Sequence, residues 1–132
     1  MSAERLFQAA LAAALSDALG ERLNAVLIGP AATATGPATA PYAELGELLS
    51  ADWSTKDAPG RELRSLVTIR DTGDGPARLH DLADDAAAAI AAIGPALPPW
   101  HIASLVLVRQ RLMRERTGWA ALIEHRARLL WV

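Results

Sequence analysis

The side chains that most often perform chemistry are sparse in this sequence and do not follow the spacing of known catalytic or metal-binding motifs. His80, His101 and His125 are never three or four residues apart, so no two of them can share one helix face around a metal ion. His125 falls on the apolar face of a predicted strand, where a buried core or interface histidine is more common than a ligand. The sequence has no cysteine, which excludes disulfides, thiolate nucleophiles and cysteine-based zinc sites.

Acidic residues offer the next candidate, because Asp81, Asp84 and Asp85 lie close enough in sequence to be considered for a divalent cation. Nearby residues add no further oxygen ligands at short spacing, and acidic side chains near a helix N-terminus are favoured by the helix dipole. We therefore interpret this group as a solvated helix face. Ser16 and Asp17 provide residue types for a hydrolase triad without its geometry, and glycine-rich phosphate loops, His-Glu-x-x-His and Gly-x-Ser-x-Gly are missing. The sequence predicts no enzyme activity, cofactor or metal.

Tryptophan and arginine are the two residue types that point to protein contacts. Four tryptophans stand beside one phenylalanine and one tyrosine, and tryptophan is enriched among interface hot spots although most tryptophans fill cores. Trp53, in a polar loop, and Trp131, one residue from the end, are the hardest to assign to a core, so we predict that they contact another subunit. Arginine is used in place of lysine at every basic position except Lys56. Guanidinium favours fixed bidentate pairing, and a GC-rich coding sequence would give the same bias.

Charge is distributed unevenly along the chain. Residues 1–100 carry seven Lys or Arg against thirteen Asp or Glu, a balance of −6, whereas residues 101–132 carry six Arg against two Glu, a balance of +4. This polarity suits a protein that contacts unlike surfaces or meets copies of itself head to tail, and it equally suits a solvated basic face on the last strands. Sequence-specific DNA binding is not expected, because the overall charge is negative and no aromatic residues are interleaved among Arg109, Arg111, Arg114 and Arg116.

Two helices are predicted from apolar residues that recur every three or four positions. The first covers residues 3–19, with Ser2 as its N-cap and Gly20 just beyond its C-terminus. The second begins near Pro76 and ends at Gly94-Pro95. Its apolar stripe consists of Leu79, Leu82, Ala83, Ala86, Ile90 and Ile93.

The other patterned segments predict strands. Residues 25–28 fit a short strand or an extended connector, and residues 31–41 a loop. Strands then follow from Tyr42, with a bulge at Gly46, and over 62–70, joined by the polar loop 52–60. Residues 102–108 read as a central strand that leaves the core as it becomes charged, and a turn at 117–118 leads into an alternating strand over 119–131.

These elements predict an α+β fold, a mainly antiparallel sheet with two helices packed on one face, in the order α-β-β-β-α-β-β. The chain of 132 residues is expected to form a single domain over 1–132. Apolar runs are shorter than the roughly 18 residues that a membrane span requires, and the N-terminus lacks the pattern of a secretory signal. We expect a soluble, unprocessed protein of the reducing cytosol or of a particle assembled there.

Three short motifs carry a resemblance to a known family. Tyr42-Ala43-Glu44-Leu45-Gly46-Glu47, then Asp52-Trp53-Ser54-Thr55-Lys56 and Gly60, followed by an amphipathic helix and a late arginine-rich hairpin, resemble the tail terminator or tail-completion proteins of long-tailed phages, in particular the version found in gene transfer agents and related prophages. The likeness covers nearly the whole chain in order and length. Arg70-Asp71 departs from the family pattern, in which an aromatic residue often ends the third strand, and this leaves the packing at the sheet edge open.

The resemblance implies a structural role without turnover. In that family the subunits form a hexameric ring that caps the tail tube and joins it to the connector of the head. It implies as partners further copies of this chain, the major tail tube protein and a head–tail connector or stopper protein, with DNA passing through the ring without sequence-specific binding. It implies a location in the neck of a phage-like particle assembled in the bacterial cytoplasm, with no membrane and no cofactor.

By the same resemblance, loops 31–41 and 52–60 would serve as docking or channel loops and the last hairpin as a subunit contact. The candidate interface residues are Tyr42, Trp53, Lys56, Arg111, Arg114, Arg126, Arg128 and Trp131. Two alternatives remain open. One is a different neck component, such as a stopper for head closure. The other is a small ligand-binding or enzymatic α+β domain with a pocket between helices and sheet, whose first sign would be a buried polar cluster around His125.

Overall fold

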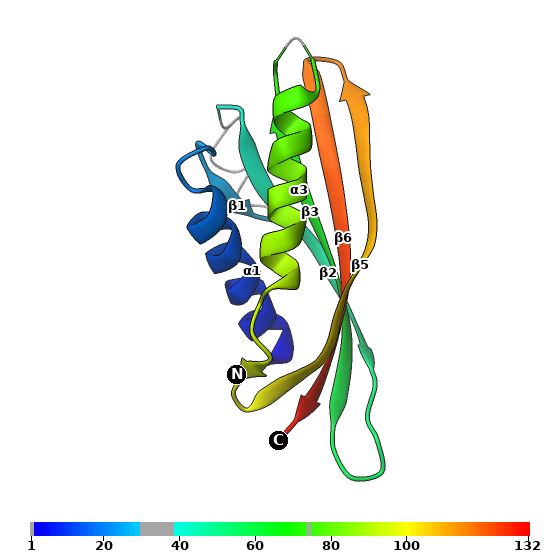
Figure 1. Cartoon of the computed structure of the whole chain (residues 1–132). Coiled ribbons are helices and arrows are strands. Elements are labelled where there is room, and N and C mark those ends of the chain that lie inside the picture. Colours follow the sequence, from blue (N-terminus) through cyan, green and yellow to red (C-terminus); the bar gives the residue numbers. More distant parts are fainter. Residues whose placement is uncertain (1, 30–38, 74) are drawn as a thin grey trace.

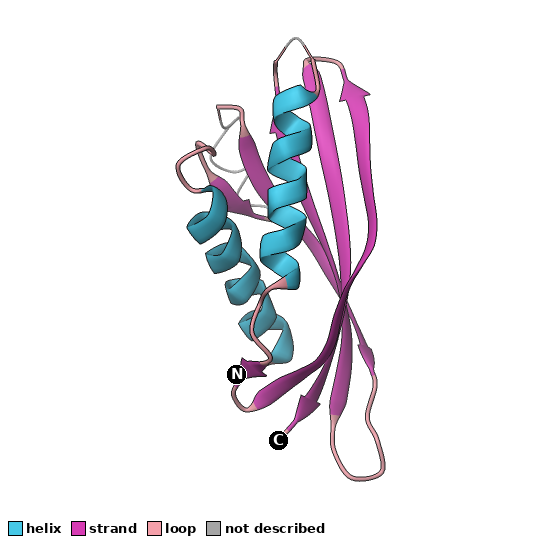
Figure 2. Cartoon of the chain, viewed as in Figure 1, coloured by secondary structure: helices cyan, strands magenta, loops and turns pink. Residues whose placement is uncertain are grey.

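Two helices cover one face of a six-stranded sheet in the computed structural model, which describes residues 2–29, 39–73 and 75–132 (Figures 1 and 2). The strand order across the sheet is β1-β2-β3-β6-β5-β4, and the predicted α+β class is confirmed. The elements, in chain order, are α1 (Ala3–Leu19), β1 (Val26–Ile28), β2 (Tyr42–Asp52), β3 (Gly60–Asp71), α3 (Ala77–Ala91), β4 (Ala96–Leu97), β5 (Trp100–Glu115) and β6 (Gly118–Trp131).

Both helices follow their sequence signals closely. The side chain of Ser2 accepts a hydrogen bond from the backbone N–H of Arg5 at 3.2 Å, which satisfies one of the free donors of the first turn of α1. The buried stripe of α1 consists of Ala3, Phe7, Leu11, Leu15 and Leu19. The buried stripe of α3 consists of Leu79, Leu82, Ala83, Ala86 and Ile90. These stripes pack on the sheet and complete one continuous hydrophobic core with the inner side chains of β2, β3 and β6.

The central strands show the predicted alternation. β2 is antiparallel to β3, and β3 is antiparallel to β6 over its whole length, so odd-numbered residues of β6 from Ala121 to Leu129 all face the helices and are fully buried. The register of β2 with β3 is interrupted between Leu45 and Leu48, which confirms the bulge predicted at Gly46. β1 runs parallel to β2 and pairs with Ala43 to Leu45.

The prediction of a central strand at 102–108 is wrong in place and in length. β5 has 16 residues and continues through the arginines, because it pairs with β6 along nearly its whole length. Among the described residues, its other side pairs only with β4, at two residues within the proline-rich segment, which the sequence did not indicate as a strand. The apolar run suggested burial on both faces, yet Val106, Leu107 and Val108 are between 38% and 46% exposed. α3 packs over the middle of the sheet and leaves this edge uncovered (Figure 1).

Two hairpins project from opposite ends of the sheet. The β5–β6 turn lies beyond the N-terminus of α3, and the β2–β3 loop extends past the helices at the other end, near both chain termini (Figure 1). The ends are separated by the length of β3, whose 12 residues span roughly 40 Å at about 3.3 Å per residue. The predicted loop 31–41 lies mostly outside the described residues.

Candidate functional site

The end of the sheet near the β2–β3 loop concentrates aromatic and basic side chains. The guanidinium of Arg128 lies over the ring of Trp53, 5.4 Å from its centroid, and its Nε donates to the Glu62 carboxylate at 3.1 Å. Trp53 is therefore half-buried rather than fully exposed as its polar loop suggested. Such a cation–π contact contributes about 0.5–1 kcal/mol at an accessible site.

The other exposed tryptophan lies at the same end. Trp131 is 47% exposed and meets Trp100 edge to face, with ring centroids 5.4 Å apart. The backbone N–H of Trp131 donates to the carbonyl of Pro59 at 2.9 Å, so the last strand holds the loop in place. Trp100 is buried beneath this contact, so Trp131 is the ring of the pair that is exposed at the end of the sheet.

The 53–59 loop has a fixed shape because its polar groups bond within the loop. Trp53 N–H donates to the carbonyl of Gly60 at 2.9 Å, and the Ser54 hydroxyl donates to Asp52 at 2.6 Å while accepting from Gly60 N–H at 3.0 Å. Thr55 closes the tip by accepting from the backbone of the residues that follow it. Lys56 is exposed at the tip. The loop thus presents a preorganised surface, which lowers the entropic cost of a contact.

The face of the sheet opposite the helices carries a network of ion pairs. Arg70 joins Glu44 at 3.3 Å and Glu115 at 3.2 Å, so the residue that departs from the family pattern links β2 to β5 across the sheet. Glu124 accepts from Arg64 at 3.0 Å and from Arg109 at 3.1 Å. Glu62 likewise accepts from Arg128 at 3.1 Å and lies 3.8 Å from Arg126. Three of the six arginines of the last hairpin, Arg109, Arg126 and Arg128, are therefore paired with glutamates on the outer face of the sheet. This agrees with the interpretation of the arginines as a solvated face.

Three arginines near the β5–β6 hairpin behave differently. Within the described part of the chain, Arg111, Arg114 and Arg116 form no ion pair, and Arg114 lies over the ring of Trp119 at 5.6 Å. Tyr42 is at the same end of the sheet, where it is paired with Arg70 in the register of β2 and β3. These residues make the end opposite the tryptophan pair basic, with Arg111 aligned with Leu122 on the outer face and Arg114 on the other face beside Trp119.

The eight predicted interface residues therefore divide between the two ends of the sheet instead of forming one surface. One end holds Trp53, Lys56, Arg128 and Trp131, and the other holds Tyr42, Arg111 and Arg114, with Arg126 on the outer face between them. That these residues contact a partner stays a prediction.

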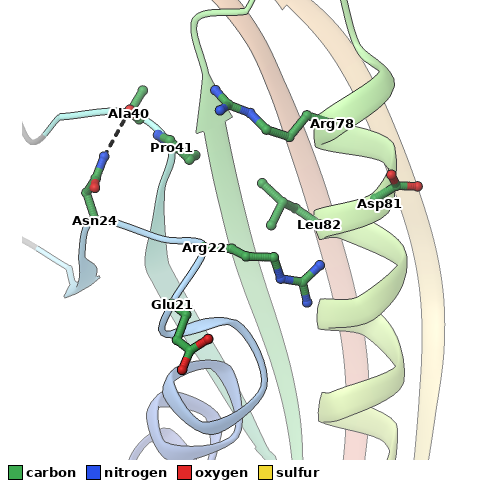
Figure 3. Close-up of a pocket in the computed structure, with 8 residues that line it drawn as sticks. All are labelled: Glu21, Arg22, Asn24, Ala40, Pro41, Arg78, Asp81 and Leu82. Atoms are coloured by element: carbon green, nitrogen blue, oxygen red, sulfur yellow. Dashed lines mark hydrogen bonds between the residues drawn. The ribbon is translucent and has the colours of Figure 1, made fainter.

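An open pocket of about 550 Å³ lies between the C-terminus of α1, the N-terminal half of α3 and the start of β2 (Figure 3). Both of its arginines have partners, since Arg22 bonds Asp85 at 2.7 Å and Arg78 bonds Asp71. Asp85 belongs to the acidic group considered for a cation, and Asp84 of that group accepts from Gln110 at 3.0 Å. Among the described residues no group of three or more His, Asp or Glu is placed to hold a metal ion.

The Asp71–Arg78 pair was missed by sequence reasoning. Asp71 is only 3% exposed at the end of β3, and Arg78 from the first turn of α3 binds both carboxylate oxygens, with its Nε 2.7 Å from Oδ2. These bonds hold the pKa of Asp71 below its usual value. Asp71 is followed in the sequence by Thr72, Gly73, Asp74, Gly75 and Pro76, residues typical of turns, where aspartate is common, so no pattern distinguished it.

A buried polar cluster around His125 would be the first sign of an enzymatic or ligand-binding domain, and the structure does bury His125 beside one other polar residue. It is fully buried on the inner face of β6, across from Ser65 of β3, and neither residue has a side-chain hydrogen-bond partner among the described residues. Burial lowers the pKa of His125, and the backbone of Ala87 opposes this shift to a smaller extent. With 0% of its surface exposed, the imidazole is out of reach of a substrate from solution.

Comparison with known proteins shows the fold. No protein-family model matches the sequence, and no curated protein matches it. Solved structures do match, and one of them is a chain described as "Virion of native gene transfer agent (GTA) particle". The two chains share 22% sequence identity with a TM-score of 0.59, and the match covers 95% of this chain and 91% of that chain. The similarity of fold therefore extends over nearly the whole length of both chains. In the described residues, no helix has the length and apolar character needed to cross a membrane.

Proposed function

We propose that this protein is a structural component of a phage-like particle or gene transfer agent, and specifically a tail terminator that forms a hexameric ring on the end of the tail tube and joins it to the head. The observation that carries the proposal is the match, over nearly the full length of both chains, to a chain from a gene transfer agent virion. The more specific role of a tail terminator comes from the resemblance of the motifs around Tyr42, Trp53 and Gly60 to that family.

The distribution of side chains supports an assembly role. A subunit of a ring contacts two neighbours through different surfaces and contacts the tube and the head through its two faces. The chain offers distinct surfaces for this purpose: a tryptophan-rich end with the preorganised 53–59 loop, and a basic end around Arg111 and Arg114. Two of its buried ionisable groups, by contrast, are unavailable for chemistry, because His125 is fully buried and the Asp71 carboxylate is already bound by Arg78.

Removal of the gene from cells that produce the particle tests the proposal. Electron microscopy is expected to show separate heads and tails, with tubes of excessive length, because a tube without a terminator lacks its stop. Expression of the intact chain in the same cells should restore joined particles, which controls for effects on neighbouring genes. Joined particles of normal tail length in the deletion strain would contradict the proposal.

Binding to isolated parts separates a terminator from a stopper. Purified protein is mixed with isolated tail tubes and, separately, with tail-less heads, and each is sedimented. A terminator should bind the tubes in the absence of heads. Sedimentation with heads alone would instead identify a head-closure protein, and binding to neither would direct attention back to a ligand-binding domain.

A further inference from the structure

We infer that neighbouring copies of this chain pair edge to edge, with the free edge of β5 in one subunit adding to the free edge of β2 in the next. The sheet would then continue from subunit to subunit around the ring. This inference rests on the proposed ring and names the surface by which it closes.

The first partner is the outer edge of β5. Among the described residues, β5 pairs with β6 on one side, and on the other side with β4 only at Trp100 and His101. The edge beyond His101 therefore presents backbone donors and acceptors of the kind that template another strand. Natural sheets usually blunt such an edge with charge or proline. On β5 the charged residues begin only at Arg109. The middle of the edge consists of Val106, Leu107 and Val108, which are all exposed. An uncovered apolar edge of this kind indicates a site of strand addition.

The second partner is the distal half of β2. β1 reaches only as far as Leu45, and within the described residues the strand from Leu48 to Asp52 pairs with β3 alone. Leu49 on this strand is 59% exposed. Beside it the outer face of the sheet is hollowed by about 150 Å³, and the hollow is lined by Leu49, Leu66, Glu47, Arg64, Ser65 and Glu124. A hollow of that size accommodates an aliphatic side chain from a neighbour.

The two edges are complementary in charge. The β2 edge carries Glu47 and Asp52, whereas the β5 edge carries Arg109, which shares Glu124 with Arg64, and Arg111. Pairing β5 with a second β5 would bring two basic strands together, so contact between unlike edges is favoured. A contact between unlike edges is heterologous, and repetition of a heterologous contact closes into a ring when the rotation allows it.

The sheet also sets the direction of pairing. β2, β3, β6 and β5 alternate in direction, so continuing the sheet places β5 antiparallel to the next β2. Leu49 and Val106 both face away from the helices, since each is aligned with an outward arginine of the adjacent strand, Arg64 and Arg126 respectively. Setting Leu49 beside Val106 brings Glu47 towards Arg109, because β5 carries a register shift between Leu107 and Arg109.

Cysteine cross-linking tests the pairing directly, because the natural chain has no cysteine. The double variant Leu49→Cys/Val106→Cys is oxidised, with and without isolated tail tubes, and analysed by non-reducing gel electrophoresis. We expect a ladder from dimer up to the full ring. Both positions are exposed, so the variant should fold, which circular dichroism checks. Matched controls are the two single variants and the double variant Leu49→Cys/His80→Cys, whose second site lies on the exposed side of α3.

Each outcome decides between the pairing and the proposed function. A ladder from the double variant alone supports the pairing. Rings of normal mass without cross-links would overturn the pairing and leave the terminator role standing, and dimers from a single variant would replace it with contact between like edges. A ladder from protein that does not bind tail tubes would support the pairing while contradicting the terminator role. Protein that stays monomeric even with tubes would overturn both.

Discussion

At the scale of single residues, the end of the sheet near the β2–β3 loop contains a stacked pair, in which the guanidinium of Arg128 lies over the ring of Trp53. Trp53 and Arg128 are 75 positions apart in the numbering and meet only because β3 and β6 pair in one register. The sequence identified both as interface candidates but not as a stacked pair. The same reason hid Asp71 and Arg78, whose contact depends on where α3 begins relative to the end of β3. The sequence could thus indicate candidate contact residues, but it could not show which residues contact each other.

Replacement of Trp53 by alanine separates a contact residue from a core residue. We expect Trp53→Ala to lower the free energy of unfolding by only about 1 kcal/mol, because the half-buried ring loses a cation–π contact and some packing. Assembly of rings or binding to tail tubes should fall much further. Denaturant unfolding of the monomer and sedimentation with tubes measure the two effects.

Trp100→Ala is the matched control for that experiment. Trp100 is 8% exposed, so its truncation should cost about 3–5 kcal/mol of stability. If Trp53→Ala destabilises the monomer to the same degree, Trp53 is a core residue and the interface has to be sought at the other end of the sheet.

Because His125 is buried, we expect the free energy of unfolding to fall in weak acid. Its folded pKa is lowered by burial, so the unfolded chain binds the proton more readily and stability rises with pH across this range. The stabilisation is fully present above the unfolded pKa of about 6.5 and is lost as the pH falls towards the folded value, by at most about 1.4 kcal/mol per pH unit. Urea unfolding at pH 7.5 and pH 5.5 should show the loss.

The variant His125→Leu should abolish this pH dependence, while His101→Gln, at an exposed position, should retain it. Glu4 and Asp71 do not interfere, because their lowered pKa values make them lose stabilisation only at more acidic pH. An unchanged slope in His125→Leu would show that the buried imidazole does not titrate in this range.

At the scale of elements, prediction succeeded where capping residues and apolar spacing indicate the same element. It failed where the position of a strand in the sheet depends on which of its faces the rest of the chain covers. α1 combines a capping serine, an apolar stripe and a terminal glycine, and β6 alternates strictly along its length, so both were predicted nearly to the residue. β5 was misplaced because a short apolar run does not distinguish a strand buried on both faces from one whose apolar side chains are exposed, as Val106 to Val108 are. β4, with two residues between prolines, gives no periodic signal at all.

The β5–β6 turn depends on one glycine. Gly118 has a φ of 151°, and a Cβ atom there would overlap the backbone carbonyl oxygen of Asp71. We expect Gly118→Ala to destabilise the fold by about 1–3 kcal/mol, because either the turn or the end of β3 has to move. Thermal unfolding of Gly118→Ala and of Gly94→Ala measures this, since a Cβ atom at Gly94 would meet nothing within 4 Å. Equal losses in the two variants would contradict a steric cause.

At the scale of the whole molecule, the sequence established that the two parts of the chain differ in charge but not where the charges lie. The structure shows that Glu62, Glu115 and Glu124 neutralise most arginines of the outer face. The remaining polarity sits at the margins, with acidic side chains on the distal part of β2 and basic ones on β5. The edge at β2 is acidic and the edge at β5 is basic, so neither edge is complementary in charge to itself. Assembly driven by these charges therefore joins unlike edges, head to tail.

That polarity makes ring formation sensitive to salt. Exposed ion pairs contribute at most about 1 kcal/mol each and are screened at high ionic strength, where the Debye length falls to about 3 Å at 1 M. Sedimentation velocity over a protein concentration series, in 50 mM and 500 mM NaCl, should therefore show the midpoint of assembly moving several-fold towards higher protein concentration at high salt.

The charge reversal Arg111→Glu should weaken assembly at low salt and reduce the salt dependence, whereas Arg5→Glu, on the exposed surface of α1, should do neither. Assembly that strengthens with salt would mean that apolar contacts dominate, and the exposed residues Val106 to Val108 and Leu49 would then be the determinants to mutate.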